Sequence, residues 1–317
     1  MKKLSTLLSI FLICTSTYSV VASDTVLDQE VVVSSKQMKI YGSLMTPKEQ
    51  TKIAALIIAG SGPTDRNGNS KFTQTNCLLQ LAQSLADHNI ASLRYDKRGI
   101  GRSTFNLVDE NLLRFDQFVD DAVACIQYLK KKKFTHIIVI GHSQGALIGT
   151  LAIQKEEASS LISLCGPGKP GDKIIEEQLR SMPQQDLTNQ AIPILNLLQS
   201  GQKASNIPIP LRAIFRPSVQ PFLISWFQYD PCEEIKKVSI PILIIAGKQD
   251  LQIPLYDAKL LHKANKTSKL VIINKMNHVL KEVGNDIKEN RASYSDPLLP
   301  ISKELIEKID QFVNHNP

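Results

Sequence analysis

The sequence lacks the patterns that hold a structural metal. Its five cysteines and six histidines form no Cys-x-x-Cys pair and no Cys/His spacing of the zinc-binding kind. It also has no internal repeat and no low-complexity tract. We therefore expect no metal and no cofactor, and we look for function among side chains that do chemistry without one.

Basic clusters are also sparse. The chain has a formal charge of +7, with acidic and basic residues interspersed. The one basic cluster, residues 130–133, lies at the end of a predicted helix, where cations are favourable. This placement is typical of a solvated helix end, so we expect no nucleic-acid partner.

Long apolar runs are missing after the N-terminus. Residues 1–23 combine Lys2 and Lys3, an apolar stretch over 4–14 and small residues before Asp24, which is typical of a secretory signal. The apolar stretch is too short to span a bilayer stably. We expect cleavage near Asp24, export to the periplasm or the medium, and no stable membrane anchor once the signal is removed.

Four cysteines follow this signal: Cys77, Cys125, Cys165 and Cys232. An even number in an exported protein permits disulfides, and four cysteines allow three complete pairings. The sequence does not choose among these pairings. Cys77 and Cys125 lie in apolar helical patterns and Cys165 ends a predicted strand, so isolated buried thiols are the alternative.

Apolar runs of strand length alternate with amphipathic helical patterns along most of the chain. Residues 29–47 predict an antiparallel hairpin. Further strands are predicted at 53–59, 91–95, 137–140, 161–165, 240–247 and 269–273, and helices at 77–87, 115–130, 256–265 and 302–313. Uniformly apolar strands that alternate with helices predict an α/β fold with a mostly parallel eight-stranded sheet flanked by helices.

This alternation stops between residues 171 and 229. The segment has helical patches, many prolines and an apolar end at 221–227. An insertion this long and apolar needs a surface to cover, so we expect a helical cap over one edge of the sheet. The expected organisation is a signal peptide at 1–23, a first part of the core at 24–170, the cap at 171–229, and a second part of the core at 230–317.

One stretch joins a predicted strand to a predicted helix through Gly141-His142-Ser143-Gln144-Gly145. The pattern predicts a nucleophile elbow, a strained turn that needs glycine on both sides because larger side chains would clash. The hydroxyl of Ser143 would stand above the sheet, and the N-terminus of the following helix would stabilise an oxyanion there. The alternative is a glycine-rich turn without a catalytic role.

A serine hydroxyl is a poor nucleophile at neutral pH and needs a base, together with a carboxylate that orients this base. Asp250 follows the predicted strand at 240–247, and His278 follows the one at 269–273. Both should project from the same edge of the sheet as Ser143. The chain order Ser, Asp, His therefore predicts a catalytic triad of Ser143, Asp250 and His278.

Other candidates for these roles have simpler explanations. His88, His136, His262 and His315 are expected at the surface or in packing. His142 adjoins the serine, but strand alternation predicts that its side chain points elsewhere. Asp230 is a weaker rival for the carboxylate, since a junction between cap and core can supply one.

Residues 29–317 resemble the α/β-hydrolase superfamily, most closely its secreted esterases and prolyl-aminopeptidase-like serine hydrolases. The resemblance implies the α/β-hydrolase fold, whose first hairpin is antiparallel. The motifs that carry it lie at 59–66, 96–103, 141–145, 247–250 and 277–278.

The resemblance also implies an oxyanion hole made by the backbone N–H groups of Ser61 and Gln144. Ala59-Gly60 stands where the family often has His-Gly, which weakens the motif match but leaves the backbone donor intact. For residues 96–103 the expectation is a loop that braces the site, with Arg98 paired to a carboxylate and no catalytic role.

The leading hypothesis is an exported serine hydrolase of the carboxylesterase type, which cleaves esters of small or medium acyl chain through an acyl-enzyme. Trp226 and Phe222 are expected to line its acyl pocket.

The alternative is a serine exopeptidase with the same triad, which would need an anionic patch for the substrate's free α-amine. Acidic residues of the cap have no assigned place at the site: Glu176, Glu177 and Asp186. A non-catalytic binding protein on this scaffold is a third hypothesis, against which the intact triad argues. The natural substrate and the oligomeric state do not follow from the sequence.

Overall fold

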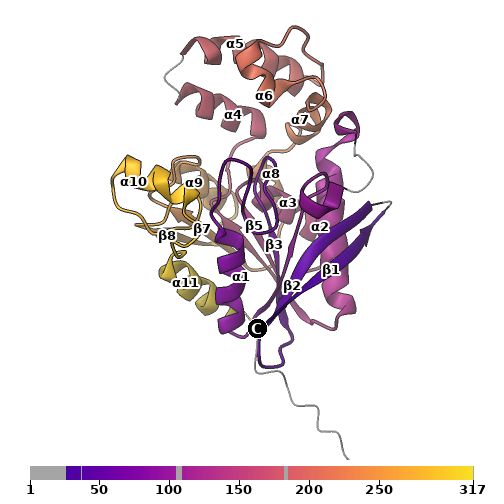
Figure 1. The fold of residues 1–317 in the computed structure, drawn as a ribbon, viewed down its shortest axis with the longest axis vertical. Helices are drawn as coiled ribbons and strands as arrows, with labels where there is room; N and C mark the ends of the chain where they lie inside the picture. Colours follow the sequence, from indigo (N-terminus) through magenta and orange to yellow (C-terminus); the bar gives the residue numbers. More distant parts are fainter. Residues whose placement is uncertain (1–25, 37, 105–108, 182–184, 317) are drawn as a thin grey trace, which may run out of the picture.

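The computed structural model of the chain describes residues 26–36, 38–104, 109–181 and 185–316, so the predicted signal at 1–23 lies outside the described residues. An eight-stranded sheet has the order β1-β2-β4-β3-β5-β6-β7-β8 (Figure 1). Its strands are β1 (Leu27–Ser35), β2 (Met38–Thr46), β3 (Ile53–Ile58), β4 (Ala91–Tyr95), β5 (His136–His142), β6 (Ser160–Leu164), β7 (Ile242–Gly247) and β8 (Lys269–Ile273).

The sheet is mostly parallel, as predicted. The hairpin of β1 and β2 is antiparallel, and β2 is also antiparallel to β4. The other pairs are parallel. The start of β7 differs from the prediction for a clear reason: the strand begins at Ile242 and not at residue 240, because Pro241 has no N–H to donate to a neighbouring strand.

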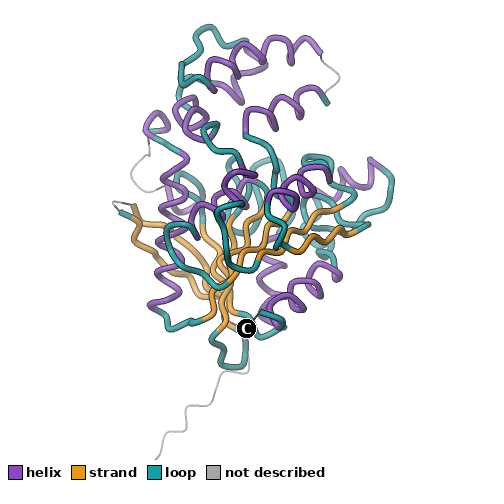
Figure 2. Tube along the Cα trace, turned by 180° about the vertical axis from the view of Figure 1, so that it is seen from behind, coloured by secondary structure: helices purple, strands orange, loops and turns teal. Residues whose placement is uncertain are grey.

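Helices cover both faces of the sheet (Figures 1 and 2). Alternate residues of β3 show why: Ala54, Leu56 and Ile58 enter one hydrophobic core, while Ala55 and Ile57 enter the other. The first core also takes residues from α2 (Phe115–Lys131), α3 (Gln144–Ile153), α8 (Pro231–Ile235) and α9 (Leu255–Ala264), and the second from α1 (Cys77–Asp87) and α11 (Lys303–Asn314). Strands that are apolar on both faces are thereby buried on both faces.

Between β6 and β7 the chain leaves the sheet and forms a separate group of helices beyond its end (Figure 1). This helical segment contains α4 (Gly171–Arg180), α5 (Gln185–Gln199), α6 (Arg212–Phe215) and α7 (Gln220–Trp226). α7 rests on α2: the ring of Trp226 stacks on that of Phe115 with centroids 6.2 Å apart, and the Phe115 N–H donates to Ser225 Oγ at 2.8 Å. The segment is thus attached to the core by an aromatic contact.

Five short elements complete the described chain, namely η1 (Gly101–Thr104), η2 (Glu110–Leu112), η3 (Ile209–Leu211), α10 (Ile287–Ala292) and η4 (Ser293–Ser295). None of the described helices is long and apolar enough to cross a membrane. The four cysteines of the described chain are free thiols, three of them buried and Cys232 half-buried. Of the two possibilities that the sequence left open, the structure therefore has isolated thiols.

Candidate active site

Ser143 lies at a sharp turn between β5 and α3. Its backbone has φ 54° and ψ −124°, a strained conformation for a residue with a side chain. A Cβ at Gly141 would overlap the carbonyl oxygen of Gly145, and a Cβ at Gly145 would overlap that of Ile58. Only glycine fits at both positions, so the sequence pattern forces the turn that lifts the serine above the sheet.

The loops after β7 and β8 bring Asp250 and His278 together. Nδ1 of His278 lies 2.8 Å from Oδ2 of Asp250. The other carboxylate oxygen accepts the N–H groups of Gln252 and Ile253 at 2.7 and 2.9 Å. Because a carboxylate only accepts, Nδ1 carries the proton and Nε2 is left with the lone pair of a base.

The carboxyl of Asp250 is held in its ionised form. Burial by itself would raise its pKa, but the charge of His278 and the hydrogen bonds that the carboxylate accepts outweigh burial and lower the pKa below its ordinary value. Asp250 is therefore an anion at neutral pH and can fix the orientation of His278. The rival Asp230 instead caps α8, where its side chain accepts the N–H of Cys232 at 2.8 Å.

Ser143 and His278 face one small cavity of about 170 Å³, which Gly60, Ser61 and His142 also line. The three residues of the predicted triad thus come from the ends of β5, β7 and β8 to one edge of the sheet. An imidazole base that a carboxylate orients beside a serine hydroxyl can accept the proton of that hydroxyl. Chemically, the arrangement suits nucleophilic catalysis.

Two backbone N–H groups border the serine. Ser61 lies in the loop after β3, and Gln144 is the first residue of α3. A Cβ at Gly60 would lie 3.0 Å from Cβ of Ser143, so the chain before Ser61 runs directly against the serine. Within the described residues neither N–H donates to a protein acceptor. Both groups are available to an oxyanion.

His142 does not point away from the site, contrary to the prediction. Its Nε2 lies 2.7 Å from the carbonyl oxygen of His278, and the two rings are 4.9 Å apart. Strand alternation determines the face of the sheet but says nothing about a loop that folds back over the strand end, and the loop after β8 does so. The position of this histidine directly before Ser143 was the available signal.

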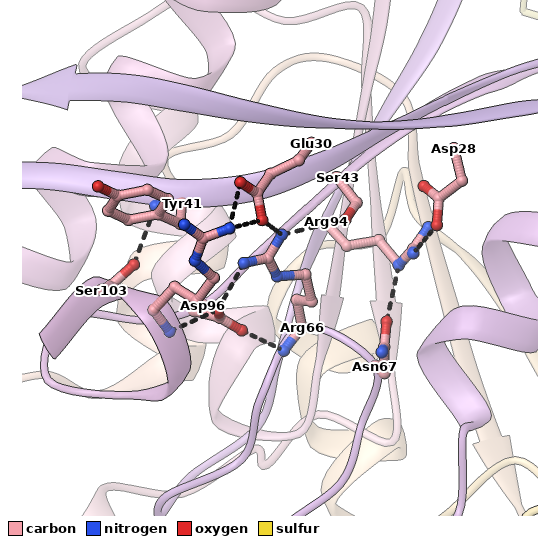
Figure 3. Close-up of polar contacts among 10 residues, drawn as sticks. Asp28, Glu30, Tyr41, Ser43, Arg66, Asn67, Arg94, Asp96 and Ser103 are labelled. Carbon is pink, nitrogen blue, oxygen red and sulfur yellow. Dashed lines mark hydrogen bonds and ion pairs between the residues drawn. The ribbon is translucent and has the colours of Figure 1, made fainter.

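Residues 96–103 brace the loop that carries Ser61, as expected. Asp96 accepts the N–H of Arg66 at 2.9 Å, its guanidinium at 2.7 Å and the N–H of Arg102 at 3.0 Å (Figure 3). Arg98 makes two hydrogen bonds to Asp121 of α2, at 2.6 and 3.1 Å. The loops after β3 and β4 are therefore tied to each other and to the helix layer.

A larger cavity of about 360 Å³ extends from Ser143 under the helical segment. Its lining is mostly apolar and includes both residues expected in the acyl pocket, Trp226 and Phe222. Gly171, the first residue of α4, packs on the Trp226 indole so closely that a Cβ there would lie 2.6 Å from the ring. Gly171 therefore packs against Trp226, a wall of this cavity, without lining the cavity itself.

The acidic residues of the helical segment are not among the residues that line this cavity. Glu176 pairs with Arg180 at 2.6 Å, Glu177 pairs with Lys169 at 2.7 Å, and the side chain of Asp186 is exposed. Over the described part of the chain, no carboxylate lines the larger cavity. The anionic patch that an exopeptidase would need is therefore missing from this lining.

Cys165, Asp250 and His278 place potential metal-binding atoms within 4.8 Å of one another. The oxygens and nitrogen that would bind a metal already hydrogen-bond to each other and to the backbone. Burial, and then the charge of Asp250, raises the pKa of the Cys165 thiol well above its ordinary value, and a protonated thiol is a poor ligand. We therefore interpret these three side chains as a hydrogen-bonded group and not as a set of metal ligands.

Comparison with known proteins gives relatives of two activities. A hydrolase family described as serine aminopeptidase, S33, matches residues 73–204. The chain is 25% identical over 246 residues to the esterase EstD of Thermotoga maritima, covering 75% of this chain and 57% of EstD. It is 25% identical over 266 residues to a proline iminopeptidase of Saccharolobus solfataricus, covering 73% of this chain and 80% of the relative. The chain thus spans less than two thirds of the length of EstD.

Solved structures share the fold. Est1E from Butyrivibrio proteoclasticus superposes with a TM-score of 0.60 at 22% identity, covering 90% of this chain and 98% of its own. The Pyrococcus furiosus esterase PF2001 has a TM-score of 0.60 at 14% identity, covering 92% and 91%.

Proposed function

We propose that this chain, which has the α/β-hydrolase fold, is a serine hydrolase that cleaves carboxylic esters of small or medium acyl chain. Ser143 Oγ attacks the ester carbonyl while His278 takes the hydroxyl proton, and His278 then gives this proton to the departing alcohol. Asp250 orients His278 through both steps. Water, activated by the same histidine, releases the acid from the acyl-enzyme.

The negative charge that forms on the carbonyl oxygen needs donors that are already in place. The N–H groups of Ser61 and Gln144 serve this role, aided by the N-terminus of α3. Neither a metal nor a cofactor takes part in this scheme, since imidazole activates the nucleophile and backbone groups stabilise the oxyanion.

The observation that carries the choice of ester over peptide is the lining of the larger cavity. Among the described residues that border it there is no carboxylate to pair with a substrate's α-ammonium group, and the aliphatic and aromatic side chains suit an uncharged acyl group. The esterase relative supports the same choice. The exopeptidase alternative is supported by the matched family's description and by the proline iminopeptidase relative.

The decisive experiment combines an active-serine probe with two substrate panels. The wild type is expected to react with a fluorophosphonate and to hydrolyse p-nitrophenyl esters far faster than aminoacyl-anilides. Ser143→Ala is expected to lose labelling and to lower ester kcat by about 10³-fold or more while it keeps its fold. Labelling that persists in Ser143→Ala removes this serine from the mechanism, and faster turnover of the anilides favours the exopeptidase.

We further propose that the protein is exported, because residues 1–23 have the charge and apolar pattern of a signal peptide. Expression of the whole chain in a bacterium, followed by N-terminal sequencing of the exported protein, should give a start near Asp24. A cytoplasmic product that keeps Met1 contradicts the proposal.

A further inference from the structure

Lys97 is a buried lysine beside the candidate active site, in the loop after β4. Its side chain is 2% exposed. Its ammonium group donates to the backbone carbonyl oxygens of Gly60 and Gly62, the second at 3.0 Å. No carboxylate in the described part of the chain forms an ion pair with it. The partners of this cation are therefore two neutral carbonyls.

These two carbonyls flank Ser61, whose N–H is the proposed oxyanion donor. The carbonyl of Gly60 and the N–H of Ser61 belong to one peptide group, and no described peptide bond is cis. In a planar trans peptide the C=O and N–H point in opposite directions. Holding the Gly60 oxygen on one side therefore fixes the direction of the Ser61 N–H on the other, and Gly60 lies against Ser143.

The charge of Lys97 adds to this geometric effect. A hydrogen bond that a carbonyl accepts polarises its amide group and strengthens the N–H of the same group as a donor. In a buried site a nearby cation also favours negative charge as it develops on a substrate oxygen. Both effects increase as the carbonyl of the ester becomes an oxyanion, so they act on the transition state more than on the bound substrate.

A lysine would be an unfavourable residue at this position if its side chain only filled space, because burying its ammonium group costs free energy. An ammonium group buried without an anion is unfavourable, and burial lowers the pKa of Lys97 to about 7. A neutral side chain could hold two carbonyls at a smaller cost. Unpaired buried charges of this kind are found preferentially where a reaction needs them.

Both ends of this contact are rigidly supported. The residue before Lys97 is Asp96, whose carboxylate binds the backbone and side chain of Arg66, five positions after Ser61 (Figure 3). The ion pair joins the loop that carries the lysine to the loop that carries its acceptors. A donor held this firmly needs no rearrangement during the reaction.

We propose that Lys97 is a positioning residue of the oxyanion hole: its ammonium group orients and polarises the Gly60–Ser61 peptide so that the Ser61 N–H stabilises the transition state. This inference rests on the serine-hydrolase function proposed above. It assigns to the 96–103 loop a role in the reaction that goes beyond bracing.

The test compares Lys97→Met and Lys97→Gln with a matched control, Lys281→Met. Lys281 is also fully buried and donates to Gln80 Oε1 at 2.7 Å and to the carbonyl of Leu299, on the side of α1 and α11. Lys97→Met removes both the donors and the charge, so kcat on a p-nitrophenyl ester should fall about 10- to 100-fold with KM unchanged within about threefold. Lys97→Gln keeps an amide donor and should recover part of this loss. Lys281→Met should lose stability but keep kcat within about twofold.

A transition-state analogue provides the readout that a merely structural role would not change. The inhibition constant of a trifluoromethyl ketone, which forms an oxyanion on the serine, should rise across the Lys97 variants by the factor by which kcat/KM falls. Unchanged kcat in Lys97→Met, or an equal loss in Lys281→Met, overturns the inference. If Lys97→Met does not fold, Lys97→Gln decides, and wild-type kcat in that variant overturns it. An inactive Ser143→Ala beside fully active Lys97 variants leaves the proposed function standing and rejects only this inference.

Discussion

Nε2 of His142 lies 2.7 Å from the backbone carbonyl oxygen of His278, so the residue before the proposed nucleophile holds the loop that carries the proposed base. A carbonyl only accepts, and Nε2 therefore carries a proton. Burial, and then the neighbouring His278, lowers the pKa of His142 to about 4. The ring is neutral at every pH at which the proposed triad could operate.

The burial of His142 predicts a pH dependence of stability. In the unfolded chain a histidine has a pKa of about 6.5, so between that value and about 4 the unfolded state binds the extra proton. Stability should therefore be complete above pH 6.5 and fall by about 3 kcal/mol as the pH drops to 4. His142→Gln, which can still donate to the carbonyl, should lose less over this window. Urea midpoints at pH 7 and pH 4 measure the difference, and equal losses in both proteins would argue against a buried neutral His142.

Asp250→Asn should retain the fold and lower kcat by about 10³- to 10⁴-fold, because an amide can donate to Nδ1 and so stabilise the wrong tautomer of His278. Steady-state kinetics on a p-nitrophenyl ester measures the loss. Asp230→Asn is the matched control, since asparagine caps a helix as well as aspartate does and should leave kcat unchanged. A large loss of kcat in the Asp230 variant, with kcat kept in the Asp250 variant, would mean that Asp230 and not Asp250 orients His278.

Trp226→Ala should change the acyl-chain profile. Each methylene buried in a closed apolar pocket contributes about 0.8 kcal/mol, or roughly fourfold in kcat/KM. We expect the wild-type kcat/KM to rise over the first few acyl carbons and the variant to flatten that rise more than it lowers the rate on acetate. Truncating a buried tryptophan costs about 3 to 5 kcal/mol of stability, so the fold of the variant is checked by thermal melting.

Phe227→Ala is the control for this experiment. Phe227 is buried and its ring lies 5.8 Å from that of Trp226, but it does not line the larger cavity. It should lose stability and keep the wild-type acyl-chain profile. An unchanged profile in a folded Trp226→Ala protein would mean that Trp226 serves packing alone.

Dialysis against EDTA should leave kcat unchanged. The proposed mechanism has no step that needs a metal, and the one cluster of possible ligands in the described chain, Cys165, Asp250 and His278, is already engaged in hydrogen bonds. Ester turnover before and after dialysis, with and without added Zn²⁺ or Mg²⁺, tests this. Activity that is lost and then restored by one of these ions would contradict it.

The fold was predictable because its signals are local and repeated. Strands buried on both faces read as unbroken apolar runs, and the glycines beside Ser143 are needed by the turn itself. Asp250 and His278 could be predicted to lie together because strand ends of a parallel sheet share an edge. Helices α8 and α10, with 5 and 6 residues, were missed because elements so short give no clear helical period.

Contacts between residues far apart in the sequence were harder to predict. In sequence Lys97 is one of several charged residues in a glycine-containing loop, and nothing local indicates that the loop after β3 closes over it. His142 was misjudged for the same reason, since its partner lies 136 positions later in the chain. Whether a polar side chain is buried depends on which loops pack together, and local sequence patterns do not predict that packing.

The helical segment between β6 and β7 leaves and rejoins the sheet at two strands that pair directly, Leu161 with Ile242 and Leu164 with Ile245. The register of β6 and β7 therefore does not depend on the stretch between them, and this stretch could be exchanged without changing the turn at Ser143. The contact between Gly171 and Trp226 limits this freedom. A larger residue at position 171 would require a smaller one at position 226. The two ends of the segment therefore have to be exchanged together. A library of variant segments should place its junctions outside both residues.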